Sequence, residues 1–355
     1  MQPRSEFNAH PPSSNAATMS PQPVTSTTPA TPATPTVTPR RSKTGVQWLF
    51  QNVVWLWLAA LIVIFGVLNP FFFTLSNLQN VLVQATVLGL LALAVSLPLM
   101  VAEIDLSIAS NMGFSAAIGA IITTRLGLSP VVGVPVGIAA ATAIGFFNGL
   151  CVTHLRMVSL IQTLAVMIVL QGSLLAVTQG NTISDMPNVY IWIGQTTIGN
   201  WPVMPVVFLV ALLGMGFLLR KTVLGRSLYA TGGNALAANS AGIRVNRVKI
   251  IAFTLSGLLS GVAGYLLAAW QMAITSDQGE GFLLYAIAAP IIGGVSVFGG
   301  RGGAAGILGG VLLLTVIHVG LAITEVPSFY VQMIGGILIF IAVAVDAIRV
   351  NFVSQ

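Results

Sequence analysis

The chain has 355 residues, of which 55% are hydrophobic and only 6% are charged, and its mean hydropathy is +0.93. About a quarter of the positions are charged in an ordinary soluble domain, so this composition excludes one and indicates a membrane protein with several spans. The formal net charge of +6 would suggest a nucleic-acid partner in a soluble chain. Here the basic residues lie in short segments beside apolar runs, so they report membrane orientation, and no nucleic-acid partner is expected.

Residues 1–44 contain nine of the 18 prolines and nine threonines. Large apolar side chains are almost absent there, so the segment has no means of forming a core and is predicted to be disordered. It also lacks the apolar core and small-residue cleavage site of a secretory signal. We expect a Pro/Thr-rich cytoplasmic tail ahead of a membrane domain over residues 45–355.

Ten segments have the length and the apolar character of membrane-spanning helices, which need about 20 mostly apolar residues. The polar residues Glu103, Asp105 and Ser107 separate the second segment from the third. The expected fold is therefore all-α, a polytopic membrane protein with about ten transmembrane helices. The segments cover about residues 48–68, 82–102, 107–124, 131–151, 158–177, 203–219, 250–270, 283–298, 304–324 and 329–348.

The distribution of positive charge predicts how these segments cross the membrane. If the tail is cytoplasmic, 13 of the 14 Lys and Arg residues fall on the cytoplasmic side, and only Arg125 lies outside. Cytoplasmic loops of membrane proteins carry such an excess. An even number of spans is predicted, with the N- and C-termini in the cytoplasm, and Arg244, Arg247 and Lys249 are expected to anchor one span at the membrane surface.

The longest polar, basic interval between apolar segments is residues 220–249, which hold six of the 14 Lys and Arg residues. Asn234 can accept hydrogen bonds from the free amides of a first helical turn, and Gly242 can take the left-handed conformation that ends a helix. The run between them is rich in Ala, the best helix former. We predict a short cytoplasmic helix over residues 234–241 that docks on a partner protein.

Polar side chains within the apolar segments are candidates for a translocation path. Glu103 and Asp105 interrupt an apolar run, where an unpaired charge costs about 3 kcal/mol or more. They either line a break in the transport path or form a turn whose carboxylates cap the helix that begins at Ser107. Amide and imidazole groups pair well with solute hydroxyls, but they also join neighbouring helices. The candidate path residues are Glu103, Asp105, Ser107, Asn111, Asn148 and His318.

Glycines recur at every fourth position in two apolar segments. Gly257 and Gly261 form one pair, and Gly302, Gly306 and Gly310 form a second series. Small residues at this spacing allow helix backbones to approach closely in lipid. Close helix packing is therefore predicted along both series.

Patterns for catalysis or for metal binding are missing from this sequence. There is no Gly-x-x-x-x-Gly-Lys-Ser/Thr phosphate loop, so ATP hydrolysis by that route is excluded. There is no Ser, His and Asp set, and His318 has no second ligand at helical spacing. The single cysteine, Cys151, excludes an internal disulfide. No catalytic residue, metal or cofactor is expected.

Four blocks of residues stand in a characteristic order. They are Ile104-Asp105-Leu106-Ser107; Phe147-Asn148-Gly149-Leu150; Gly232-Gly233-Asn234 through Lys249-Ile250; and Ile287-Ala288-Ala289 with Phe298-Gly299-Gly300-Arg301-Gly302-Gly303. From about residue 48 onward, their order and spacing resemble the permease subunits of bacterial sugar-importing ABC transporters, within the branched-chain amino acid/ribose permease superfamily. Two positions depart from the family pattern. This sequence has Glu103 where the family commonly has glycine, and Tyr285 where an acidic residue is frequent.

The resemblance implies a transport subunit in a bacterial cytoplasmic (inner) membrane, where membrane lipid surrounds it. The implied partners are an ABC ATPase subunit, an extracytoplasmic solute-binding protein, and a second permease copy or a paralogue. It also implies that the short helix lies in a groove of the ATPase, where the alanines at 235, 237, 238 and 241 allow close approach. The residues assigned to this contact are Gly233, Asn234, Ala237, Ala238, Gly242, Ile243, Asn246 and Arg247.

Two other classes of membrane protein remain compatible with the sequence. An ion-coupled secondary transporter or facilitator for a polar solute would use Glu103 and Asp105 as an ion-sensitive pair. This alternative leaves the capped basic helix without a role. A scaffold or receptor-like component is supported only by the long tail. Within the sugar class, pentoses, hexoses, sugar alcohols and a carbohydrate-like signal molecule all fit, with an identical or a mixed permease pair.

Overall fold

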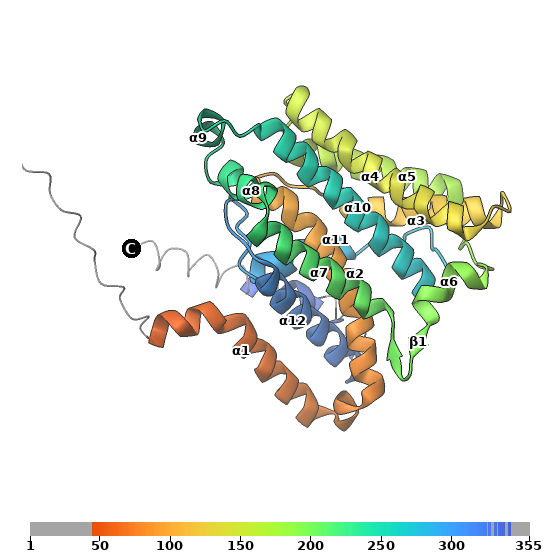
Figure 1. Ribbon diagram of the computed structural model, residues 1–355. Coiled ribbons are helices and arrows are strands. Elements are labelled where there is room, and N and C mark those ends of the chain that lie inside the picture. The colour runs from red at the N-terminus through yellow and green to blue at the C-terminus, as the bar shows by residue number, and fades with distance from the viewer. Residues whose placement is uncertain (1–44, 325, 328–329, 332, 338–339, 342–355) are drawn as a thin grey trace, which may run out of the picture. The chain divides into compact units, whose positions relative to one another are not determined.

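The computed structural model describes residues 45–324, 326–327, 330–331, 333–337 and 340–341, with side chains from residue 53 onward (Figure 1). The predicted tail, residues 1–44, lies outside the described residues. So does the C-terminal end from residue 342. The tenth predicted span, 329–348, is therefore described only in part.

The described chain is almost wholly helical, as predicted, and six of its helices are long and apolar enough to cross a membrane. These are α2 (Leu75–Met100), α4 (Pro130–His154), α5 (Ser159–Thr178), α7 (Met204–Lys221), α10 (Val245–Gln271) and α12 (Ala304–Ile323). Shorter apolar helices are α1 (Gly45–Leu68), of which Val53–Leu68 is the described apolar part, α3 (Ile108–Thr124) and α11 (Phe282–Ile292). Each of the first nine predicted spans contains one of these helices. The remaining elements are η1 (Pro70–Phe73), α6 (Asn188–Gln195), β1 (Thr197–Ile198), β2 (Trp201–Pro202), α8 (Val223–Gly233) and α9 (Ala235–Ser240).

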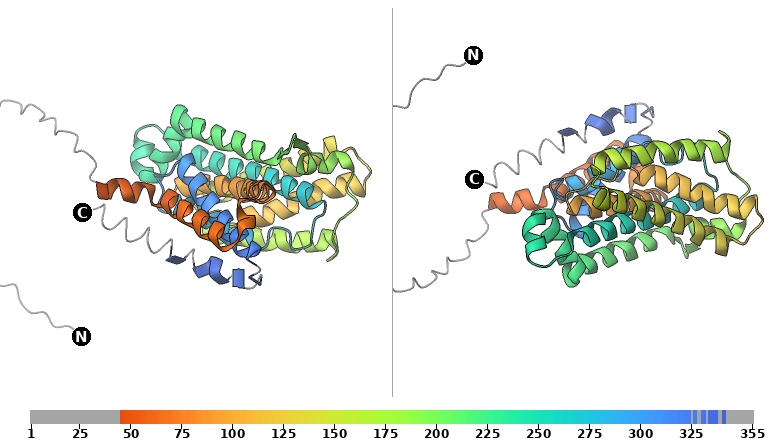
Figure 2. Two further views of the ribbon diagram at one scale, coloured as in Figure 1. Left: turned by 90° about the horizontal axis from the view of Figure 1, so that it is seen from below. Right: turned by 90° about the horizontal axis from the view of Figure 1, so that it is seen from above.

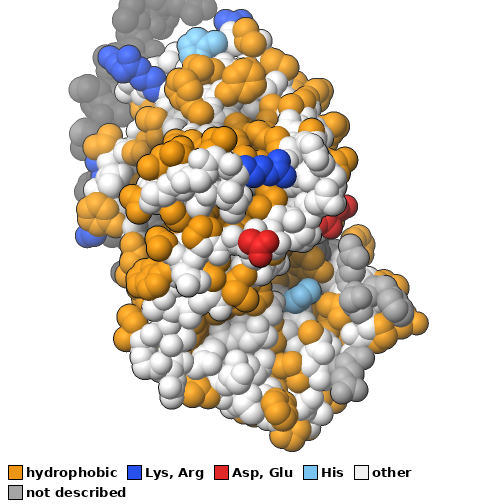
Figure 3. All heavy atoms as spheres, turned by 90° about the vertical axis from the view of Figure 1, so that its right-hand side faces the viewer, with side chains coloured by type: hydrophobic (Ala, Val, Ile, Leu, Met, Phe, Trp, Pro, Cys, Tyr) orange, Lys and Arg blue, Asp and Glu red, His pale blue; other side chains and the backbone are white. Residues whose placement is uncertain are grey.

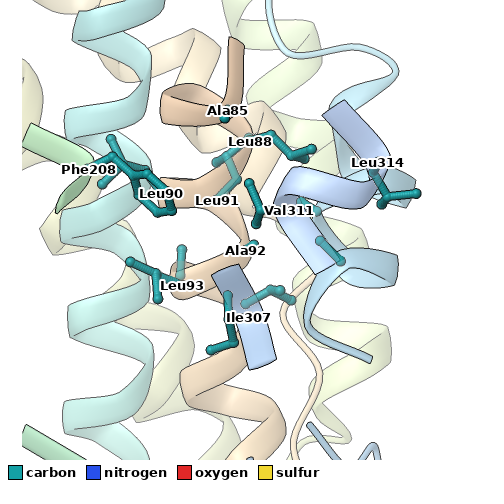
Figure 4. Close-up of a cluster of buried hydrophobic side chains, with 14 of the residues drawn as sticks. Ala85, Leu88, Leu90, Leu91, Ala92, Leu93, Phe208, Ile307, Val311 and Leu314 are labelled. Atoms are coloured by element: carbon teal, nitrogen blue, oxygen red, sulfur yellow. The ribbon is translucent and has the colours of Figure 1, made fainter. Parts of the chain in front are cut away.

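α2 is the central helix of the bundle, and 89% of its most apolar 18-residue window is buried. Thr74 caps its start by accepting a hydrogen bond from the amide of Asn77. α2 is apolar on every side, which suits a helix surrounded by others, and it packs against α7, α10, α11 and α12. Figure 4 shows Leu91 and Leu93 of α2 among side chains that include Phe208 of α7 and Ile307 of α12.

α10 joins α2 to a second group of helices, α3, α4 and α5. Its crossing with α4 is close because Gly257 faces Gly145, and a side chain at either position would overlap the backbone of the other helix. A side chain at Gly261 would meet Ala141 of α4. The close packing predicted for Gly257 and Gly261 is confirmed.

α11 ends half-way along the predicted span 283–298, and that prediction is wrong beyond residue 292. Its 11 residues rise about 16 Å, roughly half the thickness of a bilayer core. Pro290 removes one helical amide, and Gly294 takes a φ of 88° that continues into a loop. Gly306 and Gly310 of α12 pack against the α11 end as predicted, whereas Gly302 lies in the loop before α12.

The two ends of the bundle carry different elements. α8 and α9 lie together at one end, called here the α9 end, and α6 with the β1–β2 hairpin lies at the opposite end, called the α6 end (Figures 1 and 2). α10 runs from one to the other, and the side chain of Gln195 in α6 donates to the Trp270 carbonyl near the α10 C terminus at 2.9 Å. Hydrophobic side chains are spread over the face in Figure 3, and charged ones are few, as expected for a surface in contact with lipid.

Candidate coupling and translocation sites

The predicted short helix is present as α9. The Asn234 side chain accepts a hydrogen bond from the amide of Ala237 at 3.0 Å, and Gly242 has a φ of 83°. The amide of Ile243 donates to the Ala238 carbonyl at 3.0 Å, which closes the C-terminal end. Both predicted caps are therefore confirmed.

The side chains of α9 do not all face outward. Ala238 is buried and holds α9 against the rest of the chain, so its small size serves internal packing. Leu236 is 83% exposed and is the large apolar side chain that projects from α9. Its exposure was not predicted, because a single Leu within an Ala run carries no signal of direction. Ala237, Asn246 and Arg247 are exposed, as a contact role requires.

α8 precedes α9 and was missed in the sequence. Its start is marked by Thr222, whose hydroxyl accepts from the amide of Gly225 at 3.1 Å. A threonine at this position is the ordinary start signal of a helix, so the local pattern was available. The basic interval, residues 220–249, therefore contains two helices, α8 and α9, and α9 lies at the tip of the interval.

Three chain segments meet at the C-terminal end of α8: α8 itself, the C-terminal end of α2, and the loop between α11 and α12. The amide of Gly300 donates to the Met100 carbonyl at 3.0 Å, and the Tyr229 hydroxyl donates to the Gly302 carbonyl at 2.8 Å. Burial raises the pKa of the Tyr229 hydroxyl, which keeps it a neutral donor. A side chain at Gly232 would overlap the Met100 carbonyl, so α8 touches the central helix directly.

Glu103 forms an ion pair with Lys249 near the start of α10. The Lys249 and Glu103 side chains are 22% and 14% exposed, so both are largely withdrawn from solvent. The partners are 146 residues apart, and no partner could therefore be found near Glu103 in the sequence. The pair ties the loop after α2 to the start of α10, and Lys249 is engaged inside the chain as well as near its surface.

Asp105 lies in the same loop and is buried, with 2% of its surface exposed. One carboxylate oxygen accepts from the amide and the hydroxyl of Ser107 at 3.0 and 2.6 Å, and the other accepts from the Ser256 hydroxyl of α10 at 3.1 Å. The side-chain amide of Asn148 in α4 donates to the Ser107 hydroxyl at 2.9 Å. We call these four residues the Asp105 network. Asp105 closes a turn on the amide of Ser107, the residue before α3, and no side chain caps the amides of the first turn of α3.

The candidate path residues thus fall into separate places. Asn111 and Asn148 are buried, and Asn111 donates to the Ala141 carbonyl at 3.0 Å, so both join helices of the same chain. Glu103 and Asp105 are engaged by partners within the chain. His318 lies apart from all of them, on α12, where it lines a cavity of about 530 Å³. Among the described residues, no group of three or more His, Cys, Asp or Glu residues is arranged to hold a metal.

Comparison with known proteins places these features in a family. Residues 77–343 match the family described as "Branched-chain amino acid transport system / permease component". The chain belongs to this permease family. It is 37% identical over 290 residues to the ribose import permease protein of Bacillus subtilis (strain 168), covering 81% of this chain and 89% of that protein.

Two further relatives are named for other solutes. The L-arabinose ABC transporter permease protein of Azospirillum brasilense is 34% identical over 322 residues, or 89% of this permease and 93% of that protein. The autoinducer 2 import system permease protein of Klebsiella pneumoniae subsp. pneumoniae is 33% identical over 296 residues, which cover 81% of this permease and 84% of that protein. The predicted resemblance is confirmed. As a permease component, the protein is a multi-pass membrane transport subunit and not an enzyme.

Proposed function

We propose that this permease is the membrane-spanning subunit of a bacterial ABC importer for a sugar or sugar-like solute, driven by a separate ATPase subunit. The observation that carries the proposal is the family match over residues 77–343, together with high coverage of relatives named for ribose and L-arabinose. The proposal includes an extracytoplasmic solute-binding protein and a second permease copy or paralogue.

We place the permease in the bacterial cytoplasmic membrane with about ten spans, and with both termini and the α9 end in the cytoplasm. Exposed basic side chains surround α8, α9 and the start of α10, which supports this orientation. Arg125, between α3 and α4, would then lie on the outer side with the α6 end. The exposed basic residues at the α9 end are Arg220, Lys221, Arg226, Arg244 and Arg247.

We further propose that α9 docks in a groove of the ATPase. A short helix that lies in a groove needs an apolar anchor, and Leu236 projects with 83% of its surface exposed. Ala238 sets the position of α9 from within. Gly233, Asn234, Ala237, Gly242, Ile243, Asn246 and Arg247 belong to the same contact or to the turns that shape it.

A movement of α9 has a direct route into the bundle. α8 reaches the end of α2 through Gly232, and the start of α10 reaches the loop after α2 through the Lys249–Glu103 ion pair. Docking and release of the ATPase would displace these contacts together, in the manner of elements that shift between two packed arrangements.

The test of the coupling role is Leu236→Ser in the transporter reconstituted with its ATPase and binding protein. Burial of a leucine contributes roughly 2 kcal/mol, so we expect at least a tenfold loss of ATPase association and of ATP-driven uptake. Ile198→Ser is the matched control, because Ile198 is 73% exposed on β1 at the opposite end. Equal uptake and ATPase binding in wild type and Leu236→Ser would remove α9 from the interface.

The alternative of an ion-coupled transporter finds no support in its two acidic residues, since both have partners within the chain. Vesicles that contain the permease alone discriminate between the classes. Solute flux driven by an ion gradient, without ATPase or binding protein, would favour the alternative over an ABC importer.

A further inference from the structure

The cavity beside His318 lies in the half of the bundle toward the α6 end. Its wall contains Trp270 at the end of α10, Phe282 at the start of α11, and Ala322 near the end of α12. α2 closes the inner side, where Leu88 borders both the cavity and the apolar core; Figure 4 shows Leu88 with Leu314 of α12. Its volume of about 530 Å³ is in the range of small-molecule sites.

The lining combines aromatic rings with uncharged polar groups. Gln84, Tyr285, Thr315 and His318 supply amide, hydroxyl and imidazole groups, which both donate and accept hydrogen bonds. Trp270, Phe282 and Tyr285 supply aromatic rings. A monosaccharide presents hydroxyl groups at its edge and C–H groups on its faces, and this lining can satisfy both.

Five buried side chains have a polar atom without a partner among the described residues, and Thr315 is the one of them that lines the cavity. Its side chain is 3% exposed, and its hydroxyl has no hydrogen-bond partner among the described residues. A buried hydroxyl is normally paired, and we take the cavity that Thr315 lines as the place of its missing partner. Thr315 faces the same cavity as His318, one turn away on α12.

His318 and Tyr285 form the polar wall between α12 and α11. Their rings meet edge to face, with centroids 6.3 Å apart and an angle of 74° between the planes. Gln84 on α2 donates to the Asn80 side chain at 3.0 Å, which orients its amide and leaves its oxygen as an acceptor. Three helices therefore present oriented polar groups to one space.

The charge of the lining favours a neutral solute. Glu280 is the single carboxylate among the described residues that line the cavity, and no Lys or Arg lines it. An amino acid would bring a carboxylate, and the described lining offers no Lys or Arg to pair with it. A polyol needs hydrogen bonds only.

We infer that this cavity is a binding site for a monosaccharide-sized polyol in transit, in which Tyr285, Thr315 and His318 bond its hydroxyl groups and select among sugars. This rests on the proposed sugar import function and adds its location within the permease. The aromatic rings of Trp270 and Phe282 contact the C–H face of the sugar.

The experiment measures uptake of ribose, L-arabinose, D-xylose, D-glucose and L-leucine by the permease reconstituted with its ATPase and binding protein. Thr315→Val removes the unpartnered hydroxyl, and Thr315→Ser retains it. We expect Thr315→Val and Tyr285→Phe each to lower uptake of the preferred sugar about three- to tenfold and to change the order of preference, with assembly of the complex unchanged. Thr315→Ser should transport as the wild type does.

Thr142→Val is the matched control. Its hydroxyl bonds the Ile138 carbonyl of its own helix, α4, outside the cavity. Wild-type import of a sugar, with unchanged rates and preferences in Thr315→Val and Tyr285→Phe, would overturn the site while leaving sugar import intact. Wild-type import of L-leucine and of none of the sugars would instead overturn the proposed function and the site with it.

Discussion

The Asp105 carboxylate and the Thr315 hydroxyl are both polar groups inside an apolar bundle, and they differ in whether the chain supplies their partners. In the network, every oxygen of the Asp105 carboxylate is met by a donor from the same chain. In the cavity, the Thr315 hydroxyl is buried without such a partner among the described residues. The Asp105 carboxylate, satisfied by its own chain, stabilises the fold. We assign the unsatisfied Thr315 hydroxyl to a solute that passes through the cavity.

The largest expected effect on stability is at the centre of the network. Asp105→Ala leaves the Ser107 and Ser256 hydroxyls and the Ser107 amide without their acceptor, and we expect a loss of about 3 kcal/mol in the free energy of unfolding. The measurement is unfolding in mixed detergent micelles, followed by circular dichroism. Asp105→Asn keeps an acceptor oxygen and should lose less.

A double-mutant cycle tests whether the network acts as a unit. Asn148→Leu removes a donor to the Ser107 hydroxyl, so its effect should not add to that of Asp105→Asn, since both act on Ser107. Strict additivity of the two losses would show that the two side chains act independently. An undiminished stability in Asp105→Ala would contradict the network itself.

The ion pair at the α9 end is expected to matter less for stability and more for coupling. Glu103→Gln should cost about 1 kcal/mol or less, because the Gln oxygen still accepts a hydrogen bond from Lys249, and Lys249 keeps 22% of its side chain exposed to solvent. ATP hydrolysed per solute imported should rise about twofold in proteoliposomes, since one link between α10 and the loop after α2 is lost. Lys249→Gln should reproduce the effect, and the double variant should be no worse than either single one.

The smallest effect on stability is expected in the cavity. Thr315→Val replaces a hydroxyl that bonds nothing in the described chain, so the free energy of unfolding should change by less than about 0.5 kcal/mol. The same unfolding assay measures it beside Asp105→Ala. A loss as large as that of Asp105→Ala would show that Thr315 has a structural partner, and the contrast between the two regions would disappear.

Local signals in the sequence were sufficient for α9, because Asn234 and the amide it caps are three residues apart. They were insufficient for Glu103, whose partner Lys249 is 146 residues away and is brought near only by the packing of α10 on α2. For Asp105, the sequence left a path residue and a helix cap open, and it gave no sign of the hydrogen bond from Ser256 of α10, which is 151 residues away. Hydropathy also misplaced the end of α11, since the apolar run continues past the residue at which Pro290 and Gly294 end the helix.

The direction of side chains on a short helix is equally invisible to composition. Four alanines in one run look alike, yet Ala238 is buried and its neighbours are exposed. The cavity was beyond sequence reasoning as well, because its polar groups come from α2, α11 and α12. Of its lining, the sequence marked His318, as a lone polar residue in an apolar segment, and Tyr285, as a departure from the family pattern.

Glycines at the C-terminal end of α8 bring its backbone into direct contact with the loop before α12. Gly232 and Gly233 meet Gly299 and Gly300 backbone to backbone, and the latter two take φ values of 84° and 72° that glycine adopts without strain. Side chains between moving elements can absorb a displacement by changing rotamer, but a contact between backbones has no such slack. If docking of the ATPase shifts α8, as we propose, this junction has no side chain that could absorb the displacement before it reaches the end of α2.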